Sequence, residues 1–433
     1  MLTIWGRRQP HCDGISRRNF LRVGAFGAGL TLADMLRARA TAAESTTRAA
    51  APTSSPKSAI MIYLPGGPSH MDMYDLKPNA PKEYRGEFNP IATNVTGVQI
   101  CELMPRQAAM WDKLAVIRSI VSVEEHSDSL VMTGYSEAQN RSAHHPSFGA
   151  VVSKLSKSEG TDVTPFVSLR GMSVGCEPGY LGVAHRAFTP DGAGFRNLSL
   201  ANGVHVNQMN DRKGLLSKLD SIQRDVDATG AMKGMDSFET RAFDMIATGT
   251  VRKALDLTHE EPRTRDRYKG IEQFLTARRL VEAGVGCVTL SYGGWDTHGA
   301  NFKTLRKQLP VLDRGVSNLI QDLHDRGLSD DVVTVVWGEF GRTPRINNSD
   351  GGGRDHWGPV MSAMIAGGGL KMGQAIGSTS SRGEMPKDRR CTVPQVLSTI
   401  YHAMGIDPSM TFPNGSGRPM YILDDRMLIN ELV

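Results

Sequence analysis

Four short apolar runs along this chain have the length and the flanking turn residues of buried β-strands. They cover residues 59–64, 114–119, 285–291 and 332–337, and a polar or glycine-rich segment follows each one. Near-continuous apolar strands are typical of a parallel sheet that is covered on both faces. The pattern therefore predicts an open parallel sheet with polar segments at the carboxyl ends of its strands, where such sheets bind ligands.

Segments between and after these predicted strands show the periodicity of amphipathic helices. Apolar residues recur at three- and four-residue spacing over residues 302–326, and residues 268–283 and 392–404 also favour helices. Strands that alternate with helices define an α/β chain. Residues 184–265 differ, because polar turns are followed there by charged helical sequence with little strand signal. We interpret this zone as a helical insertion or cap.

The amino terminus carries the pattern of an export signal. Arg17 and Arg18 precede a glycine- and alanine-rich apolar stretch that ends near Leu36, as in twin-arginine signal peptides. This stretch is too short to cross roughly 30 Å of hydrocarbon as a helix. Small residues predict cleavage between residues 41 and 44. An ordinary amphipathic first helix is the alternative interpretation.

Three segments follow from the export interpretation. Residues 1–43 are the predicted signal peptide, residues 44–57 are a flexible tether, and residues 58–433 are the folded domain. The expected partner is the twin-arginine export machinery, and the expected location is the periplasm or the extracellular space. After the signal peptide no run approaches 20 apolar residues, so we predict no transmembrane span in the mature protein.

Removing the predicted leader changes the charge balance. The leader contains seven of the 50 basic residues and two of the 45 acidic residues. The rest of the chain is therefore close to neutral. Bulk charge favours neither nucleic acid nor an anionic membrane as a partner.

Four cysteines remain after the predicted cleavage. Cys101, Cys176, Cys287 and Cys391 are widely separated and form no Cys-x-x-Cys pair, which disfavours a zinc knuckle. Outside the cytoplasm, one or two disulfides are an alternative to free thiols, but the spacing does not show which cysteines would pair.

Three later segments gather residues of the kinds that bind metals. They are Gly-Gly-Trp-Asp-Thr-His at residues 293–298, Gly-Glu-Phe-Gly-Arg-Thr at residues 338–343 and Gly-Arg-Asp-His at residues 353–356. Oxygen and nitrogen donors favour zinc, manganese, magnesium or calcium over copper(I). We therefore predict a divalent metal site with five candidate ligands: Asp296, His298, Glu339, Asp355 and His356.

The first predicted strand ends at a Pro-Gly-Gly-Pro turn, and the loop after it carries four polar residues: Ser69, His70, Asp72 and Asp75. This loop, followed by Asp-Thr-His, Glu-Phe-Gly-Arg-Thr and Asp-His, resembles the secreted bacterial domain of unknown function 1501 family over residues 58–430. That family is placed in the alkaline phosphatase and sulfatase superfamily. The resemblance implies an alkaline-phosphatase-like three-layer α/β/α sandwich with a mostly parallel central sheet. It also implies one or two divalent metal ions and hydrolysis of phosphate or sulfate esters.

The resemblance assigns roles to the later segments position by position. Asp296 and His298 resemble the superfamily's Asp and His pair after a late strand, and Asp355 and His356 resemble a later ligand group. Glu339 stands where other members have an Asp-His pair, so one imidazole is absent from the pattern. The chain also lacks a Cys-x-Pro-x-Arg motif, which disfavours a formylglycine sulfatase.

On the first loop, the resemblance implies that Asp72 binds metal, with Ser69 or His70 near the reacting group. Ser69 is the candidate nucleophile because it lies on this loop, and a metal-bound hydroxide is the alternative attacking group. A serine after proline is also typical of a turn or a helix cap, which is the alternative for Ser69. Arg342 is predicted to hold the substrate anion, or else to form a structural ion pair with the glutamate beside it. His126, after the second predicted strand, is either a site residue or a hydrogen-bonding loop residue.

Together these observations predict an exported, metal-dependent hydrolase of phosphate or sulfate esters. The expected substrate is an anionic ester, and esters of polysaccharides are among the candidates. The alternative is a noncatalytic envelope protein that binds a sulfated or phosphorylated polymer. A third interpretation is a structural or assembly partner without metal. Fold alone does not decide among them.

Overall fold

The computed structural model describes the folded part of the chain in four stretches: residues 57–156, 163–169, 172–190 and 248–433. The predicted signal peptide, the predicted tether except for Lys57, and residues 191–247 of the predicted insertion lie outside the described residues. These assignments stay predictions. The described ends of the insertion zone contain short helical segments, among them α12 (Thr250–Leu255) and α13 (Pro262–Arg267).

Within the described residues, the main sheet has eight strands. Their spatial order is β11 (Gln374–Ile376), β4 (Ala115–Val121), β10 (Met361–Gly367), β7 (Val332–Trp337), β1 (Ser58–Tyr63), β6 (Cys287–Ser291) and β5 (Phe166–Ser168), with β14 (Cys391–Thr392) also paired to β4. Only β10 runs antiparallel to its neighbours in this sheet. The four predicted strands correspond to β1, β4, β6 and β7, so the prediction of a mostly parallel sheet is confirmed.

Alternate side chains of the central strand β1 enter two different hydrophobic cores. Ile60 and Ile62 belong to one core, whereas Ala59, Met61 and Tyr63 belong to the other. This alternation follows from the two-residue period of a strand. Because both sets are buried, helices must cover both faces of the sheet, and the predicted three-layer arrangement is confirmed.

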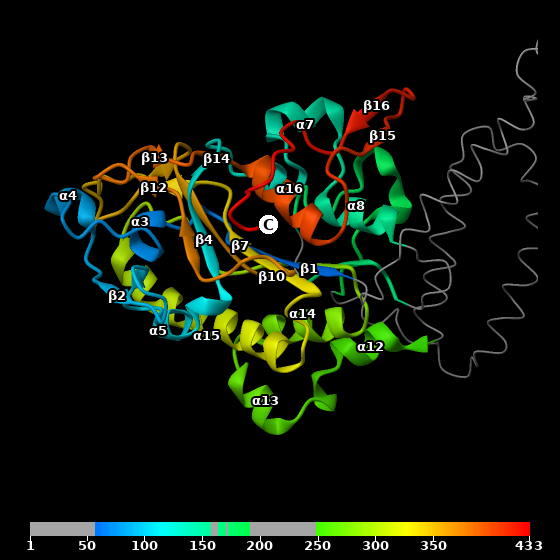
Figure 1. Cartoon of the computed structure of the whole chain (residues 1–433), viewed down its shortest axis with the longest axis horizontal. Helices are drawn as coiled ribbons and strands as arrows, with labels where there is room; N and C mark the ends of the chain where they lie inside the picture. Colours follow the sequence, from blue (N-terminus) through cyan, green and yellow to red (C-terminus); the bar gives the residue numbers. More distant parts are fainter. Residues whose placement is uncertain (1–56, 157–162, 170–171, 191–247) are drawn as a thin grey trace, which may run out of the picture. The chain divides into compact units, whose positions relative to one another are not determined.

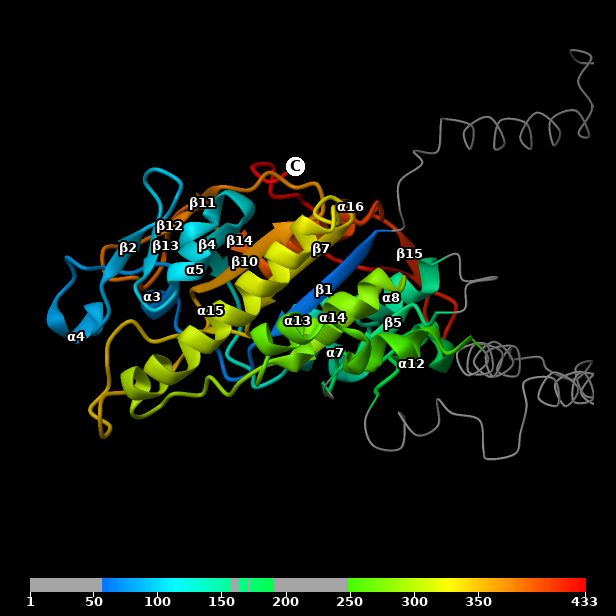
Figure 2. The same cartoon turned by 90° about the horizontal axis from the view of Figure 1, so that it is seen from below.

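Figure 1 shows the two helical layers on opposite sides of the sheet, and Figure 2 shows α14 and α15 running together across one face. The layer on that face consists of α5 (Pro105–Ala109), α14 (Glu272–Glu282) and α15 (Asn301–Asp325). The opposite layer consists of α6 (Ser129–Thr133), α8 (Phe148–Leu155) and α16 (Val393–Ala403). The predicted helices at residues 268–283, 302–326 and 392–404 thus appear with slightly different ends.

Further short elements lie outside the main sheet. They are the short helices α3 (His70–Met73), α4 (Lys82–Arg85) and α7 (Glu137–Ala143), and the strand pairs β2 (Pro90–Ala92) with β3 (Gln99–Cys101), β8 (Gly341–Arg342) with β9 (His356–Trp357), β12 (Ser378–Thr379) with β13 (Pro386–Asp388), and β15 (Thr411–Pro413) with β16 (Pro419–Tyr421).

Strand β10 was not predicted, and its direction determines what lies at the carboxyl edge of the sheet. Because β10 is antiparallel to β4 and β7, its amino end lies at the edge where those strands end. The segment that enters β10 therefore meets the segments that leave the parallel strands. Residues that follow the parallel strands and residues that precede β10 therefore lie at the same edge of the sheet.

The four cysteines of the folded domain are all buried free thiols, so no disulfide forms among the described residues. Burial raises the pKa of the Cys287 thiol above its usual value, which keeps it protonated and unreactive. In the part of the chain that the structure covers, no helix combines the length and apolar character needed to cross a membrane.

Candidate metal centre

Four chain segments bring titratable side chains to the carboxyl edge of the sheet. His126 follows β4, Asp296 and His298 follow β6, Glu339 follows β7, and Asp355 and His356 lie in the segment that enters β10. All five ligand candidates from the later motifs are therefore brought to one edge. The antiparallel direction of β10 is what adds its histidine and aspartate to the group.

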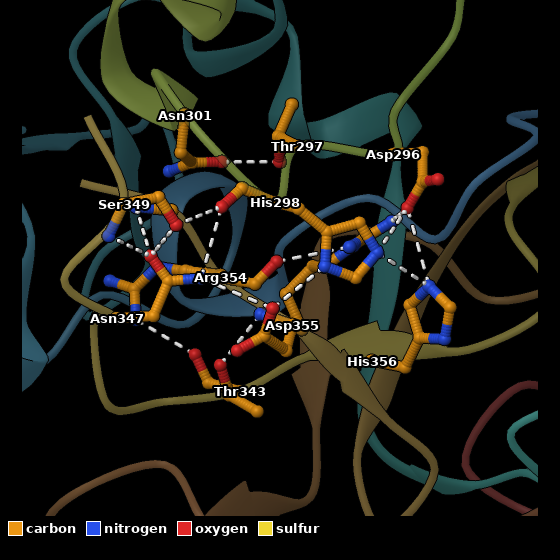
Figure 3. Close-up of polar contacts among 12 residues, drawn as sticks. Asp296, Thr297, His298, Asn301, Thr343, Asn347, Ser349, Arg354, Asp355 and His356 are labelled. Atoms are coloured by element: carbon orange, nitrogen blue, oxygen red, sulfur yellow. Dashed lines mark hydrogen bonds and ion pairs between the residues drawn. The ribbon is translucent and has the colours of Figure 1, made fainter. Parts of the chain in front are cut away.

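Three of these side chains point their donor atoms toward one another (Figure 3). His298 Nε2 lies 3.0 Å from His356 Nε2 and 3.0 Å from Asp296 Oδ1. His356 Nε2 lies 3.3 Å from the same Asp296 oxygen. Zinc bonds of 2.0–2.1 Å in tetrahedral geometry set neighbouring ligand atoms roughly 3.3 Å apart. The donor triangle is therefore close in size to one triangular face of a tetrahedral zinc shell.

His126 joins this group from the loop after β4. Its Nε2 lies 3.9 Å from Asp296 Oδ2 and its Nδ1 lies 3.7 Å from Glu339 Oε1. His126, Asp296 and His356 each offer a ligand atom, and these atoms all lie within 4.8 Å of one another. The only sequence signal for His126 was its place just after a predicted strand, and that signal was too weak to include it among the ligand candidates.

Asp355 fixes the orientation of the His298 ring rather than entering the triangle. Its Oδ1 lies 2.7 Å from His298 Nδ1, and Asn347 Nδ2 donates to the same oxygen over 3.1 Å (Figure 3). The hydrogen bond with His298 holds the pKa of the Asp355 carboxyl below its usual value. A carboxylate behind an imidazole is the usual way in which proteins orient a metal-binding histidine.

His356 is suited to metal binding by its charge state. Burial holds the pKa of its imidazole below the usual value, so the neutral form predominates at neutral pH. Only neutral imidazole has a free nitrogen lone pair for a metal ion.

Glu339 is buried directly behind the exposed group. Its two carboxylate oxygens accept backbone hydrogen bonds from Gly66 over 2.8 Å and from Gly67 over 3.2 Å. Burial raises the pKa of the Glu339 carboxyl. Gly66 has φ of 98°, and a β-carbon there would lie 2.5 Å from the backbone nitrogen of Asp296. Glycine is therefore required where the first loop passes between Glu339 and Asp296.

The structure corrects the predicted role of Arg342. Its guanidinium is fully buried and donates to the carbonyls of Gly66, Gly67 and Arg354. It also forms an ion pair of 2.5 Å with Asp296 Oδ1, not the expected pair with the neighbouring glutamate. Because its donors serve the protein itself, Arg342 positions Asp296 and the first loop and does not hold a substrate anion.

The structure likewise gives no support to Asp72 as a metal ligand. Arg354, which is fully buried, binds both Asp72 oxygens, with distances of 2.7 Å from Nε and 3.1 Å from Nη2. Asn301 Nδ2 donates to Asp72 Oδ2 over 3.0 Å. Both oxygens therefore have buried donors already, and Asp72 holds Arg354, which directly precedes Asp355 and His356 in the chain.

Ser69 and His70 are both buried, with 2% and 1% of their surfaces exposed. Ser69 begins α3 without a side-chain capping bond, and its hydroxyl has no hydrogen-bond partner among the described residues. A substrate cannot reach a hydroxyl buried to this extent without rearrangement of the loop. The structure therefore argues against Ser69 as the nucleophile and His70 as its neighbour at the reacting group.

His70 makes stability sensitive to acid. Its Nε2 lies 2.9 Å from the Gly383 carbonyl, so Nε2 carries the proton, whereas Nδ1 has no partner within the described residues. Burial lowers the pKa of His70 below its usual 6.5. The unfolded chain therefore binds a proton below about pH 6.5 that the folded chain does not bind, and stability falls as pH falls through this value.

We expect the free energy of unfolding of the wild type to fall by about 1–2 kcal/mol more than that of His70→Gln between pH 7.5 and pH 5.0. Urea titrations of both proteins at the two pH values measure this difference. An equal loss in both proteins would show that His70 does not carry the acid sensitivity.

A cavity of about 360 Å³ opens beside the metal-centre residues. His126 and Glu339 line it, together with the hydroxyl-bearing residues Tyr63, Ser127 and Ser291. The cavity therefore gives a small molecule access to the His126 imidazole and the Glu339 carboxyl group.

The fold and the site define an α/β protein with a cluster of histidines and carboxylates at the carboxyl edge of its sheet. The chain belongs to the family described as protein of unknown function (DUF1501), whose model matches residues 56–433. The family predicted from the order of the motifs is therefore confirmed. No curated protein matches the chain.

Several solved structures are similar to this chain at low identity. A sulfatase from Pseudoalteromonas sp. is 9% identical, with 81% of this chain and 68% of that chain covered and a TM-score of 0.37. A lipoteichoic acid synthase from Listeria monocytogenes is 11% identical, with 86% and 76% covered and a TM-score of 0.33. A lipooligosaccharide phosphoethanolamine transferase from Neisseria meningitidis is 12% identical, with 89% and 64% covered and a TM-score of 0.32. Likenesses at this level carry no inference about substrate.

Proposed function

We propose that this chain is an exported, metal-dependent hydrolase of phosphate or sulfate esters. The observation that supports the proposal most directly is the convergence of donor atoms from His126, Asp296 and His356 within 4.8 Å. Imidazole nitrogens beside carboxylates suit zinc or manganese better than magnesium or calcium. The proposal of export rests on the twin-arginine pattern. It is tested by asking whether the protein is recovered outside the cytoplasm as a shorter chain that has lost the predicted leader.

In the proposed site, Asp296 and His356 hold the metal together with His126. His298 is a further candidate ligand, because its Nε2 lies 3.0 Å from both the His356 Nε2 and the Asp296 Oδ1 atoms, and Asp355 fixes its ring. A divalent metal there would polarise the ester and stabilise negative charge on the transferring group. Arg342 keeps Asp296 in place through their ion pair of 2.5 Å. Arg342 and Asp355 thus orient the candidate ligands Asp296 and His298. The cavity beside the metal centre stays open to a substrate.

Water that enters the cavity is the proposed nucleophile, because the structure buries Ser69. Glu339 lines the same cavity, and the raised pKa of its carboxyl makes it a better proton acceptor. In the reaction, the water oxygen bonds to phosphorus or sulfur, the ester bond breaks, and the leaving alkoxide takes a proton from solvent water and departs as the alcohol. Glu339 accepts the proton that the attacking water loses.

Metal analysis tests this proposal first. We expect the purified full-length chain, after incubation with zinc or manganese and dialysis, to retain close to one equivalent of metal. The Asp296→Ala, His356→Ala double variant is expected to retain almost none, because it loses two of the three converging donors. His402→Ala removes an exposed histidine at the end of α16 and is the matched control, which should bind metal like the wild type.

The outcomes separate the functional alternatives. Retained metal together with turnover of 4-nitrophenyl phosphate or 4-nitrophenyl sulfate supports the hydrolase. Retained metal without turnover of any ester in a broad screen would favour a noncatalytic protein that binds anionic polymers. Failure of the wild type to bind zinc, manganese, magnesium or calcium would overturn the metal-dependent proposal.

A further inference from the structure

A second cavity, of about 550 Å³, adjoins the metal centre. We call it the apolar groove. Three segments line it: residues 121–124 after β4, residues 358–359 between β9 and β10, and Met385, Pro386 and Arg390 around β13. Its volume lies in the range of pockets that bind small organic molecules.

The lining exposes apolar side chains that a protein normally buries. Val123 and Met385 are 38% and 53% exposed, and they are two of only five large apolar residues that are exposed in the described part of the chain. Both line the same groove, beside Val121, Pro359 and Pro386. Grouped apolar exposure of this kind marks a binding surface more often than scattered apolar residues do.

Met385 is held in its exposed position by an anchored loop. The backbone nitrogen of Ser380 donates to the Met385 carbonyl over 2.9 Å. Trp357 Nε1 donates to the adjacent Glu384 carbonyl over 2.8 Å, and His70 bonds the Gly383 carbonyl. The loop therefore presents the methionine at a fixed place on the wall of the groove, where its flexible side chain can adapt to an apolar ligand.

Two chain segments connect the lining of the groove to the residues of the metal centre. Ser122, which lines the groove, donates its hydroxyl hydrogen bond to the Glu339 carbonyl. Gly358, also in the lining, follows two positions after His356 and donates to Glu124 Oε1 over 3.0 Å. These contacts place the groove beside the metal centre.

The rim of the groove adds a positive charge. Arg390 is exposed, and no other described residue forms a hydrogen bond or an ion pair with its side chain. Glu124, the acidic residue of the lining, already accepts the Gly358 hydrogen bond. Glu124 thus has a partner within the protein, whereas the Arg390 guanidinium is available to an anionic group of a ligand at the rim.

We propose that the apolar groove binds the organic group of the ester, so that the substrates are alkyl or aryl esters with an anionic head rather than esters of hydroxyl-rich polymers. The assignment of this ligand as a substrate rests on the proposed hydrolase function. The preference of the groove for an apolar group is independent of the hydrolase function, because it is measured by binding alone.

Fluorescence of Trp357 provides the test. The other tryptophans of the folded domain, Trp111, Trp295 and Trp337, are at most 1% exposed, whereas Trp357 is partly exposed and bonded to the loop that carries Met385. The full-length chain is titrated with octyl sulfate, below its micelle concentration, and with glucose 6-sulfate. Both carry one sulfate, and they differ in the organic group.

We expect octyl sulfate to bind at least about tenfold more tightly than glucose 6-sulfate, because its alkyl chain leaves water. Trp357→Phe should remove the fluorescence response. Met385→Asp should weaken octyl sulfate binding by about tenfold or more and leave metal content unchanged. Met427→Asp is the matched control, since Met427 is 65% exposed and lies outside the groove lining.

Equal affinity for the two sulfates would overturn the proposed groove. So would an equal effect of Met385→Asp and Met427→Asp on octyl sulfate binding. A wild type that prefers octyl sulfate but retains no metal would support the groove and overturn the hydrolase, so the two failures are distinguishable.

Discussion

Replacing Asp72 with asparagine is expected to lower the free energy of unfolding by about 3–5 kcal/mol. Arg354 is fully buried and pairs with both Asp72 oxygens. The asparagine keeps the shape of the side chain but leaves the Arg354 charge without its compensating carboxylate. An unpaired charge in the protein interior costs far more than an exposed ion pair contributes.

Urea unfolding at pH 7.5 measures this loss. Glu87→Gln is the control, because Glu87 pairs with Arg306 over a similar distance of 2.9 Å with both side chains about half exposed. That change should cost no more than about 1 kcal/mol. If Asp72→Asn instead unfolds like the wild type and loses its metal, then Asp72 is a ligand, as the resemblance implied.

Replacing Arg342 with lysine is expected to weaken metal affinity by about 10- to 100-fold, the usual cost of losing a residue that orients a metal ligand. Lysine keeps the positive charge, but its single ammonium cannot reproduce the planar set of donors that arginine offers. In the wild type these donors bind Asp296 and the carbonyls of Gly66, Gly67 and Arg354. The lysine variant would leave several of these buried acceptors without partners.

Competition with a zinc-binding dye measures the affinity, and circular dichroism shows whether the variant still folds. Arg345→Lys is the matched control, since Arg345 is an exposed arginine three positions away, and its affinity should stay within about twofold of the wild type. An Arg342→Lys protein that binds zinc normally but has a raised KM would restore the role of Arg342 in holding the substrate anion.

The parallel strands could be predicted because burial on both faces leaves an uninterrupted apolar run in the sequence. Strands β1 and β7, buried at every position, carry this signal most clearly. Strand β10 is also buried, but it mixes serine, alanine, methionine and glycine and follows a Gly-Pro turn. Its position is set by antiparallel pairing with β4 and β7, which depends on tertiary contacts rather than on local pattern.

Residue type and place in the chain were enough to predict which later motifs come together at the sheet edge. They were not enough to predict the partners of the buried charges. The Asp72 and Arg354 pair joins residues 282 positions apart, and the Arg342 bonds to the first loop span about as much of the chain. An isolated sequence offers many acidic partners for each arginine, and only the packed fold selects one.

The direction of β10 also fixes when the donor set of the proposed metal centre can be complete. His126 leaves an early strand, Asp296 leaves a middle one, and His356 enters β10 near the end of the domain. A growing chain has no complete donor set until β10 has emerged from the ribosome and paired across the sheet. Metal would therefore stabilise the finished protein by binding to it, and it would play no part in guiding the early steps of assembly.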